Sequence, residues 1–195
     1  AFAAEADLAQ PSPLEVNPLD KNAIVDWLEA NPNNIWALNT TCANLVEEEK
    51  FLEAIPLLER SIRLHPRQRG SGSPYGMLAR AHRELGQAED ELAVLERRVR
   101  IRKAQAGIPQ IVDALQDLAE CHKLQDRPDE AESTYREAMD LCDETVEAHH
   151  APLRMTLLYF GMFLNERERH ADAVQFLESA FDCCKLPAEV PTLTA

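Results

Sequence analysis

The sequence has little glycine, few basic residues and no long apolar run. Only 6 of its 195 residues are glycine, and these lie between apolar segments, which favours helices over a turn-rich β fold. No apolar run approaches the roughly 20 residues that a helix needs to cross a bilayer, so we expect no membrane span in this chain. The 34 acidic residues outnumber the 20 basic ones and give a formal net charge of −14. Because that charge repels phosphate groups, we expect no nucleic-acid partner.

Motifs that would indicate catalysis are also missing. The sequence contains no G-x-x-x-x-G-K-[ST], no H-E-x-x-H and no G-x-S-x-G. We therefore expect no enzyme activity, no catalytic residue, no cofactor and no metal. The 5 cysteines include no C-x-x-C pair, which predicts free thiols and a cytoplasmic protein. A periplasmic or exported protein stays open as an alternative.

One segment departs from the acidic average. From Arg60 to Lys103 the chain has 11 basic and 5 acidic residues, which leaves 9 basic and 29 acidic residues elsewhere. A basic segment in an acidic protein is a candidate for recognising an acidic group. Nucleic-acid binding through it is the least favoured alternative, and that alternative predicts an affinity that salt weakens strongly.

What the sequence does contain is an internal repeat, which decides the fold class. An acidic residue followed by alanine opens three helical segments, at Glu53-Ala54, Glu130-Ala131 and Asp172-Ala173. A large residue follows each alanine by four positions, namely Leu58, Tyr135 and Leu177. Glu91 and Leu95 fill the same two slots in a weaker copy. That copy predicts either looser packing or a rotated helix whose apolar stripe is Ala88, Leu92 and Leu95.

A second helical pattern precedes each of these segments. Two bulky residues stand three apart, a small one follows, and a larger one stands three further on. The four sets are Leu38, Thr41, Cys42, Leu45; Tyr75, Leu78, Ala79, His82; Leu115, Leu118, Ala119, His122; and Leu157, Phe160, Gly161, Leu164. The small residues would let two antiparallel helices approach closely, while the large ones fill the spaces between repeats.

These slots resemble the tetratricopeptide repeat, whose pattern is W-x-x-L-G-x-x-Y, then A-x-x-x-F, then P, over about 34 residues. The resemblance implies an all-α fold, a right-handed α-solenoid of antiparallel helix hairpins, with about four repeats after an N-terminal half repeat at Asp20 to Ala30. We expect a solenoid over residues 20–185, a linker or disordered segment at 1–19 and a linker at 186–195. The later repeats are similar to the lengthened kinesin-light-chain type.

In such a stack the first helix of each repeat lines a concave groove. Side chains that avoid the packing slots should point into it and bind a partner protein or peptide. By helical spacing the candidate binding residues are Trp36, Asn39, Arg80, Arg83, Gln116, Glu120, Lys123, Met155, Leu158 and Met162. The same spacing places Ala43, Val46, Ser73, Gly76, Asp113 and Asn165 on these groove faces.

Two parts of this groove suggest a ligand. Arg80 and Arg83 would bind an acidic group, and the apolar side chains of Met155, Leu158 and Met162 would adapt to a partner. The alternative is that both arginines pair with acidic neighbours and the methionines belong to the core. Co-chaperones of this family grip a terminal carboxylate with a Lys/Asn/Arg clamp, which is not present here.

The sequence thus predicts a non-catalytic protein-interaction scaffold, with two alternatives. The chain could be the docking or regulatory repeat region of a larger enzyme, possibly membrane-associated, such as a peptidase. It could also be a self-assembly module, because no further repeat covers Phe176, Phe181 and Cys183 on the last helix. A weak homo-oligomer through that helix is therefore a further prediction.

Overall fold

The computed structural model describes residues 20–66, 73–142 and 147–183, which form α-helices and no strand. The helices of these ranges are α1 (Lys21–Ala30), α2 (Ile35–Glu47), α3 (Phe51–Leu64), α4 (Pro74–Glu84), α5 (Ala88–Gln105), α6 (Ile108–Leu124), α7 (Pro128–Asp140), α8 (Glu147–Glu166) and α9 (His170–Asp182). The predicted all-α class is confirmed. The predicted linkers at 1–19 and 186–195 lie outside the described residues, as does Cys184.

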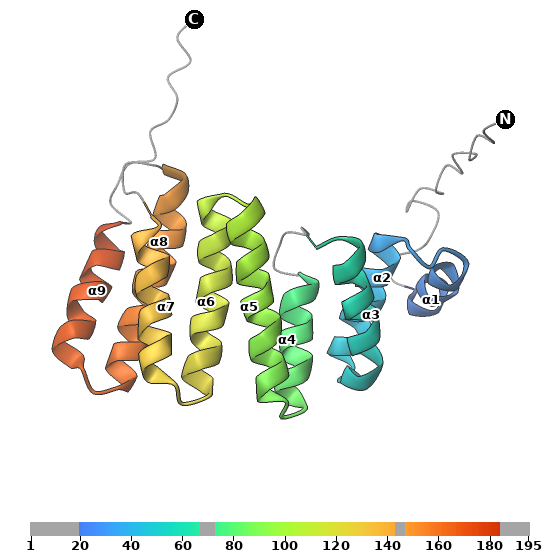
Figure 1. The fold of residues 1–195 in the computed structure, drawn as a ribbon, viewed down its shortest axis with the longest axis horizontal. Coiled ribbons are helices and arrows are strands. Elements are labelled where there is room, and N and C mark those ends of the chain that lie inside the picture. The colour runs from blue at the N-terminus through green and yellow to red at the C-terminus, as the bar shows by residue number, and fades with distance from the viewer. Residues whose placement is uncertain (1–19, 67–72, 143–146, 184–195) are drawn as a thin grey trace, which may run out of the picture.

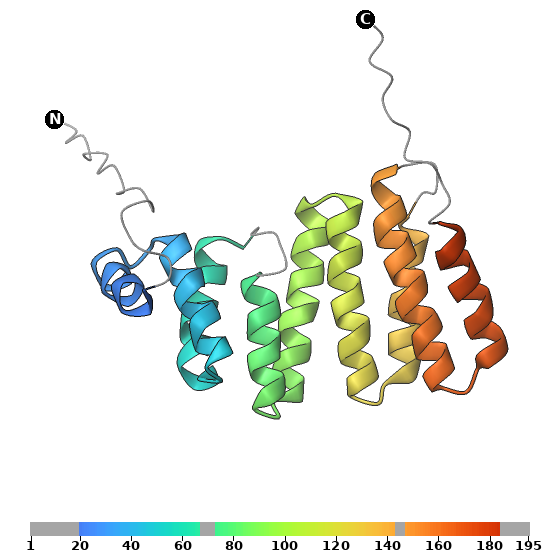
Figure 2. The same ribbon diagram turned by 180° about the vertical axis from the view of Figure 1, so that it is seen from behind.

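The helices form hairpins that stand side by side in two layers. Figure 1 shows α3, α5, α7 and α9 nearer the viewer, and Figure 2, from behind, brings α2, α4, α6 and α8 to the front. Each hairpin pairs one helix of each layer, so the four repeats predicted from the slots are present. The helix α1 precedes them as the predicted half repeat.

The half repeat is fixed to the first full one by caps and packing. The Asp20 side chain accepts hydrogen bonds from the backbone amides of Asn22 and Ala23, which starts α1. Ile24 and Leu28 are buried against α2 and α3. The Trp27 and Trp36 rings meet edge to face with their centroids 6.2 Å apart. Trp36 therefore packs at the α1–α2 junction.

The predicted small-residue slots are buried where the paired helices cross. Ala54, Ala119 and Ala131 have no exposed surface, and Ala173 is nearly as buried. Gly161 is the tightest of these positions, because a Cβ atom there would lie 2.7 Å from Cγ of Leu177 on α9. The pair α8–α9 thus depends on the absence of a side chain at Gly161.

The turn inside each hairpin has one residue in the left-handed backbone conformation. The positive φ values belong to Glu49 (59°), Gly86 (71°), Asp126 (54°) and Glu168 (62°). In each case the amide of the next residue donates to a carbonyl five positions back, as Lys50 does to Leu45 and Gln87 does to His82. This is the Schellman arrangement that ends a helix, and it turns each hairpin in the same way.

The later repeats are longer, as the spacing predicts. The helices α5, α6 and α8 have 18, 17 and 20 residues, whereas α2 has 13 and α4 has 11.

Two glycine variants test the packing account. Gly161→Ala should lower the free energy of unfolding by about 1–3 kcal/mol, because the new methyl group overlaps Leu177. Gly76→Ala in α4 is the control: nothing lies within 4 Å of its added Cβ, and a helix interior favours alanine by about 0.5–1 kcal/mol. Urea unfolding of both variants should give opposite signs. Equal effects would contradict the account.

The turns give a second pair of variants. Gly86→Ala should destabilise the fold by about 1 kcal/mol, since φ is 71° there and a side chain is strained in that region. Glu168→Gly should have the opposite effect, by about 0.5–1 kcal/mol, because it removes a side chain from the same conformation. Thermal unfolding followed by circular dichroism measures both. A loss of stability in Glu168→Gly would show that the turn depends on the glutamate.

Candidate functional site

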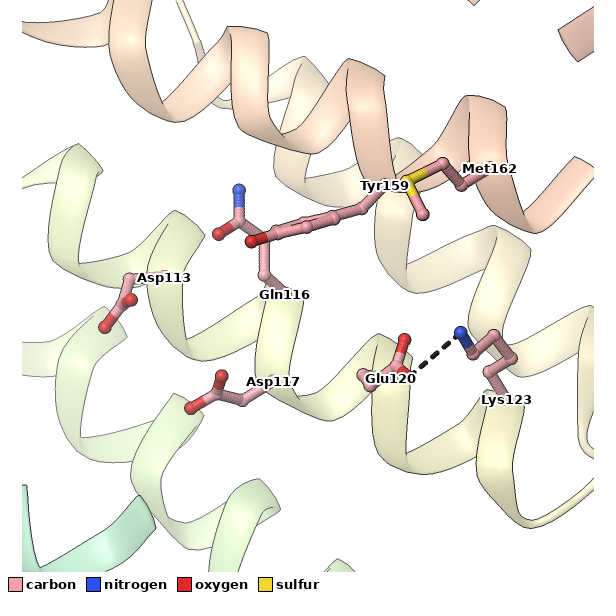
Figure 3. A pocket seen from close by; sticks show the side chains of 7 residues that line it. All are labelled: Asp113, Gln116, Asp117, Glu120, Lys123, Tyr159 and Met162. Carbon is pink, nitrogen blue, oxygen red and sulfur yellow. Dashed lines mark ion pairs between the residues drawn. The ribbon is translucent and has the colours of Figure 1, made fainter. Parts of the chain in front are cut away.

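The layer of first helices is hollowed by two adjoining cavities. One, the α6–α8 cavity, has a volume of about 380 Å³ and is lined by Asp113, Gln116, Asp117, Glu120, Lys123, Tyr159 and Met162 (Figure 3). The other, the α4–α6 cavity, has a volume of about 390 Å³ and is lined by Val46, Gly76, Met77, Ala79, Arg80, Arg83, Leu95, Asp117 and Glu120. Asp117 and Glu120 belong to both, so the two form one groove across α4, α6 and α8.

At the α4 end, the two predicted arginines line the same cavity but differ in their partners. Arg83 donates from Nε to Oε1 of Glu91 at 2.7 Å, and its Nη2 lies 2.6 Å from the same oxygen. Arg80 is exposed and has no ion pair within the described residues. The alternative in which both arginines pair with acidic neighbours therefore holds for Arg83 alone.

Glu91 fills the slot that alanine occupies in the other repeats, and it is only 3% exposed. Leu92 and Leu95 are buried as the rotated stripe predicts, but Ala88 is exposed. The repeat thus keeps its register with a carboxylate at the crossing point. Its negative charge is compensated by Arg83. Burial raises the pKa of the neighbouring Cys121 thiol to about 12, and the Glu91 charge adds to that shift.

In the middle of the groove, a buried arginine holds two carboxylates. Arg98 of α5 is 4% exposed and forms ion pairs through its two terminal nitrogens with Asp113 and Asp117 of α6. Burial lowers the pKa of the Arg98 guanidinium, and the charge of Asp113 opposes that shift. Asp113 is exposed and Asp117 is half-buried, so Arg98 fixes both on the groove wall from the side of the core.

Glu120 and Lys123, both predicted groove residues, form a 2.9 Å ion pair. Lys123 also lies 3.6 Å from Glu166 of α8. Partial burial lowers the pKa of Lys123, but both glutamates raise it, and the net shift is upward. Lys123 therefore stays charged across the physiological range, and its contact with Glu166 links α6 with α8.

The α8 wall is mainly apolar. Met162 is 50% exposed and Tyr159 is 40% exposed, and both line the α6–α8 cavity. Figure 3 shows the Tyr159 ring extending from α8 toward Gln116 of α6. Gln116 in turn donates to Thr156 at 2.7 Å and so joins the two repeats. Leu158 is exposed beside this cavity but does not line it.

Leu158 and three further candidate binding residues lie outside both cavities, the three for identifiable reasons. Trp36 packs on Trp27, as described above. Asn39 accepts a hydrogen bond from Ser61 of α3 at 2.6 Å, which turns its side chain toward the other layer. Met155 is half-buried. The structure therefore gathers Arg80, Arg83, Gln116, Glu120, Lys123 and Met162 around the groove.

Sequence reasoning missed five residues that shape this groove: Met77, Asp117, Tyr159, Glu91 and Arg98. The first three each stand one position after a residue that the spacing places in the groove. The groove face is thus one residue wider than the pattern assumes. Glu91 and Arg98 belong to α5. The signal that could have found them was a charged residue at a position of α5 that is buried.

The outer face of α9 differs in part from the prediction. Phe181 is 64% exposed, and together with Val174 and Leu177 it lines a hollow of about 490 Å³. Phe176, by contrast, packs inward, with its ring centroid 4.7 Å from that of Phe160. The predicted self-association surface therefore lacks Phe176, and the association itself stays a prediction.

Within the described ranges, no helix combines the length and apolar character needed to cross a membrane. Over the same ranges, no three potential ligands gather in a geometry that could hold a metal ion.

Known proteins share this architecture. The family model of the tetratricopeptide repeat matches residues 110–185. No curated protein sequence matches the chain.

Three solved structures illustrate the likeness. Nearly identical TPR-like repeats of a putative kinesin light chain from Podosopora anserina have a TM-score of 0.66 and 15% identity over 84% of each chain. MamA from Desulfovibrio magneticus RS-1 has a TM-score of 0.60 and 14% identity over 85% of this chain and 84% of that one. YrrB, described as a TPR protein with an unusual peptide-binding site, has a TM-score of 0.54 and 18% identity over 84% and 75%. At these identities the likeness concerns the fold.

The ion pair between exposed Arg83 of α4 and buried Glu91 of α5 allows a double-mutant test. Arg83→Ala should destabilise the fold by about 1–3 kcal/mol, because it leaves the Glu91 carboxylate buried without its partner. Glu91→Ala restores the alanine of the other repeats and should change stability by less than about 1 kcal/mol. The double variant should unfold like Glu91→Ala in urea. A double variant as unstable as Arg83→Ala would refute this account.

Proposed function

We propose that the chain, whose residues 110–185 match the family model of the tetratricopeptide repeat and whose fold is similar to solved TPR-like repeats, is a non-catalytic scaffold that binds a peptide segment of a partner protein in its groove. The observation that carries this proposal is the continuous hollow across α4, α6 and α8. Its walls combine apolar side chains with a few charged groups, as peptide sites require. Arg80, Tyr159 and Met162 on these walls are exposed, so they are available to a ligand.

The α4 end of the groove suits an acidic group of that peptide. Arg80 is exposed there and has no ion pair in the part of the chain that the structure describes, and Arg83 contacts Glu91 through Nε and Nη2. The remaining donors of Arg83 are then held in place before the ligand arrives. A side chain that is already ordered loses less entropy on binding, which favours affinity. Glu91 therefore supports the arginine as well as occupying a packing slot.

The known relatives support the same role at the level of the architecture. YrrB is described as having a peptide-binding site, and its fold is similar to that of this chain. The proposal for this chain depends on its own groove residues. The predicted role as part of a larger enzyme stays a prediction about the whole protein.

Charge reversal in the groove tests the proposal. Peptides of 12 residues are selected from a random display library on the full chain and measured by fluorescence anisotropy. Arg80→Glu should weaken the selected peptides at least about tenfold, because it places a carboxylate opposite the acidic group of the ligand. Arg100→Glu is the matched control, since Arg100 is exposed on α5 outside both cavities. The proposal fails if both variants bind equally.

A further inference from the structure

Among the described residues, the α6–α8 cavity has more negative charge than the cations paired with its carboxylates neutralise. Four carboxylates surround it or lie at its edge, and two cations pair with them. The carboxylates are Asp113, Asp117, Glu120 and Glu166, and the cations are Arg98 and Lys123. This wall therefore has a net charge of about −2, whereas at the α4 end Arg80 has no ion pair with any residue that the structure describes.

The two aspartates are held ready for a second partner. Arg98 reaches both from behind and contacts only Oδ2 of each. Within the described residues, no side chain donates to Oδ1 of Asp113 or Asp117. Because Arg98 is almost fully buried and packed within the stack, it cannot follow the aspartates out to solvent. Both carboxylates are thus fixed at the cavity wall with one oxygen each available.

The α8 wall, opposite the two aspartates, favours organic cations over inorganic ones. The exposed Tyr159 ring lines the cavity, and the Met162 thioether lies on the same side of α8 (Figure 3). An aromatic face attracts an organic cation, and a methionine side chain adapts to the aliphatic stem that bears it. A hydrated inorganic ion would gain nothing from either group. The chemistry of the two walls together matches a lysine or arginine side chain.

We propose that the α6–α8 cavity binds a basic side chain of the same peptide whose acidic residue lies at Arg80 and Arg83. This inference depends on the proposed peptide groove and adds the charge order of the ligand. An acidic residue lies over α4, and a lysine or arginine lies between α6 and α8. This charge order excludes a ligand with acidic residues alone, because Asp113 and Asp117 would repel it.

The methionines provide a direct test, because the chain has 4 of them and two line the groove. Met77 lines the α4–α6 cavity and Met162 lines the α6–α8 cavity. The full chain is labelled with ¹³C at the methionine methyl groups, and Met77→Leu and Met162→Leu assign their signals. The probes are N-acetylarginine amide, N-acetylglutamate amide and, as a neutral control, N-acetylglutamine amide.

We expect arginine amide to move the Met162 signal saturably, with a dissociation constant below about 10 mM, and to leave Met77 unchanged. Glutamate amide should move Met77, and glutamine amide should move neither. Tyr159→Ala and Asp113→Asn should each weaken the arginine amide at least about fivefold. Leu158→Ala is the matched control, since Leu158 is the exposed neighbour outside the cavity.

The outcomes separate the two proposals. No saturable shift at Met162, an equal shift with glutamine amide, or full binding in Tyr159→Ala would overturn the basic-residue inference. If one of these results is found but N-acetylglutamate amide still moves the Met77 signal, the proposed peptide groove stands without the site for a basic side chain. If the selected peptides bind Arg80→Glu as tightly as the unchanged chain, and N-acetylarginine amide shifts no methionine signal, both proposals fall.

Discussion

The close crossing of two helices within each repeat is the constraint on which the rest of the structure depends. Small residues at the crossing, such as Ala54 and Ala131, let the layers approach until the large side chains between repeats are buried. Gly161 shows how narrow the tolerance is, because even a methyl group would meet Leu177. The crossing fixes the rotation of every first helix. It thereby decides which side chains are left to line the groove.

The second repeat meets the same constraint in a different way. It places Glu91 at the crossing and keeps it there through Arg83, whose guanidinium also lines the groove. Arg98 does the equivalent for Asp113 and Asp117. In both cases a buried charge on α5 holds a groove residue in position. Packing and recognition are therefore connected at this point of the solenoid, where the basic segment of the sequence lies.

The sequence predicts the architecture well because its slots are local. Alanine and its large partner four residues later recur on one helix face, and the number of repeats follows from counting them. The groove is harder to predict. Tyr159 and Asp117 stand one position outside the expected face, and Asn39 is drawn away by Ser61 of the next helix. The pairs of Glu91 and Arg98 join different helices, so no spacing within one helix indicates them.

The central claim is that partners bind on the first-helix layer and not on the outer layer. Photo-cross-linking of a bound partner peptide, followed by mass spectrometry of the adducts, tests it most directly. The account predicts adducts on α4, α6 and α8, at side chains such as Met77, Tyr159 and Met162 that line the groove. Adducts confined to α3, α5, α7 or the exposed face of α9 around Phe181 would contradict it.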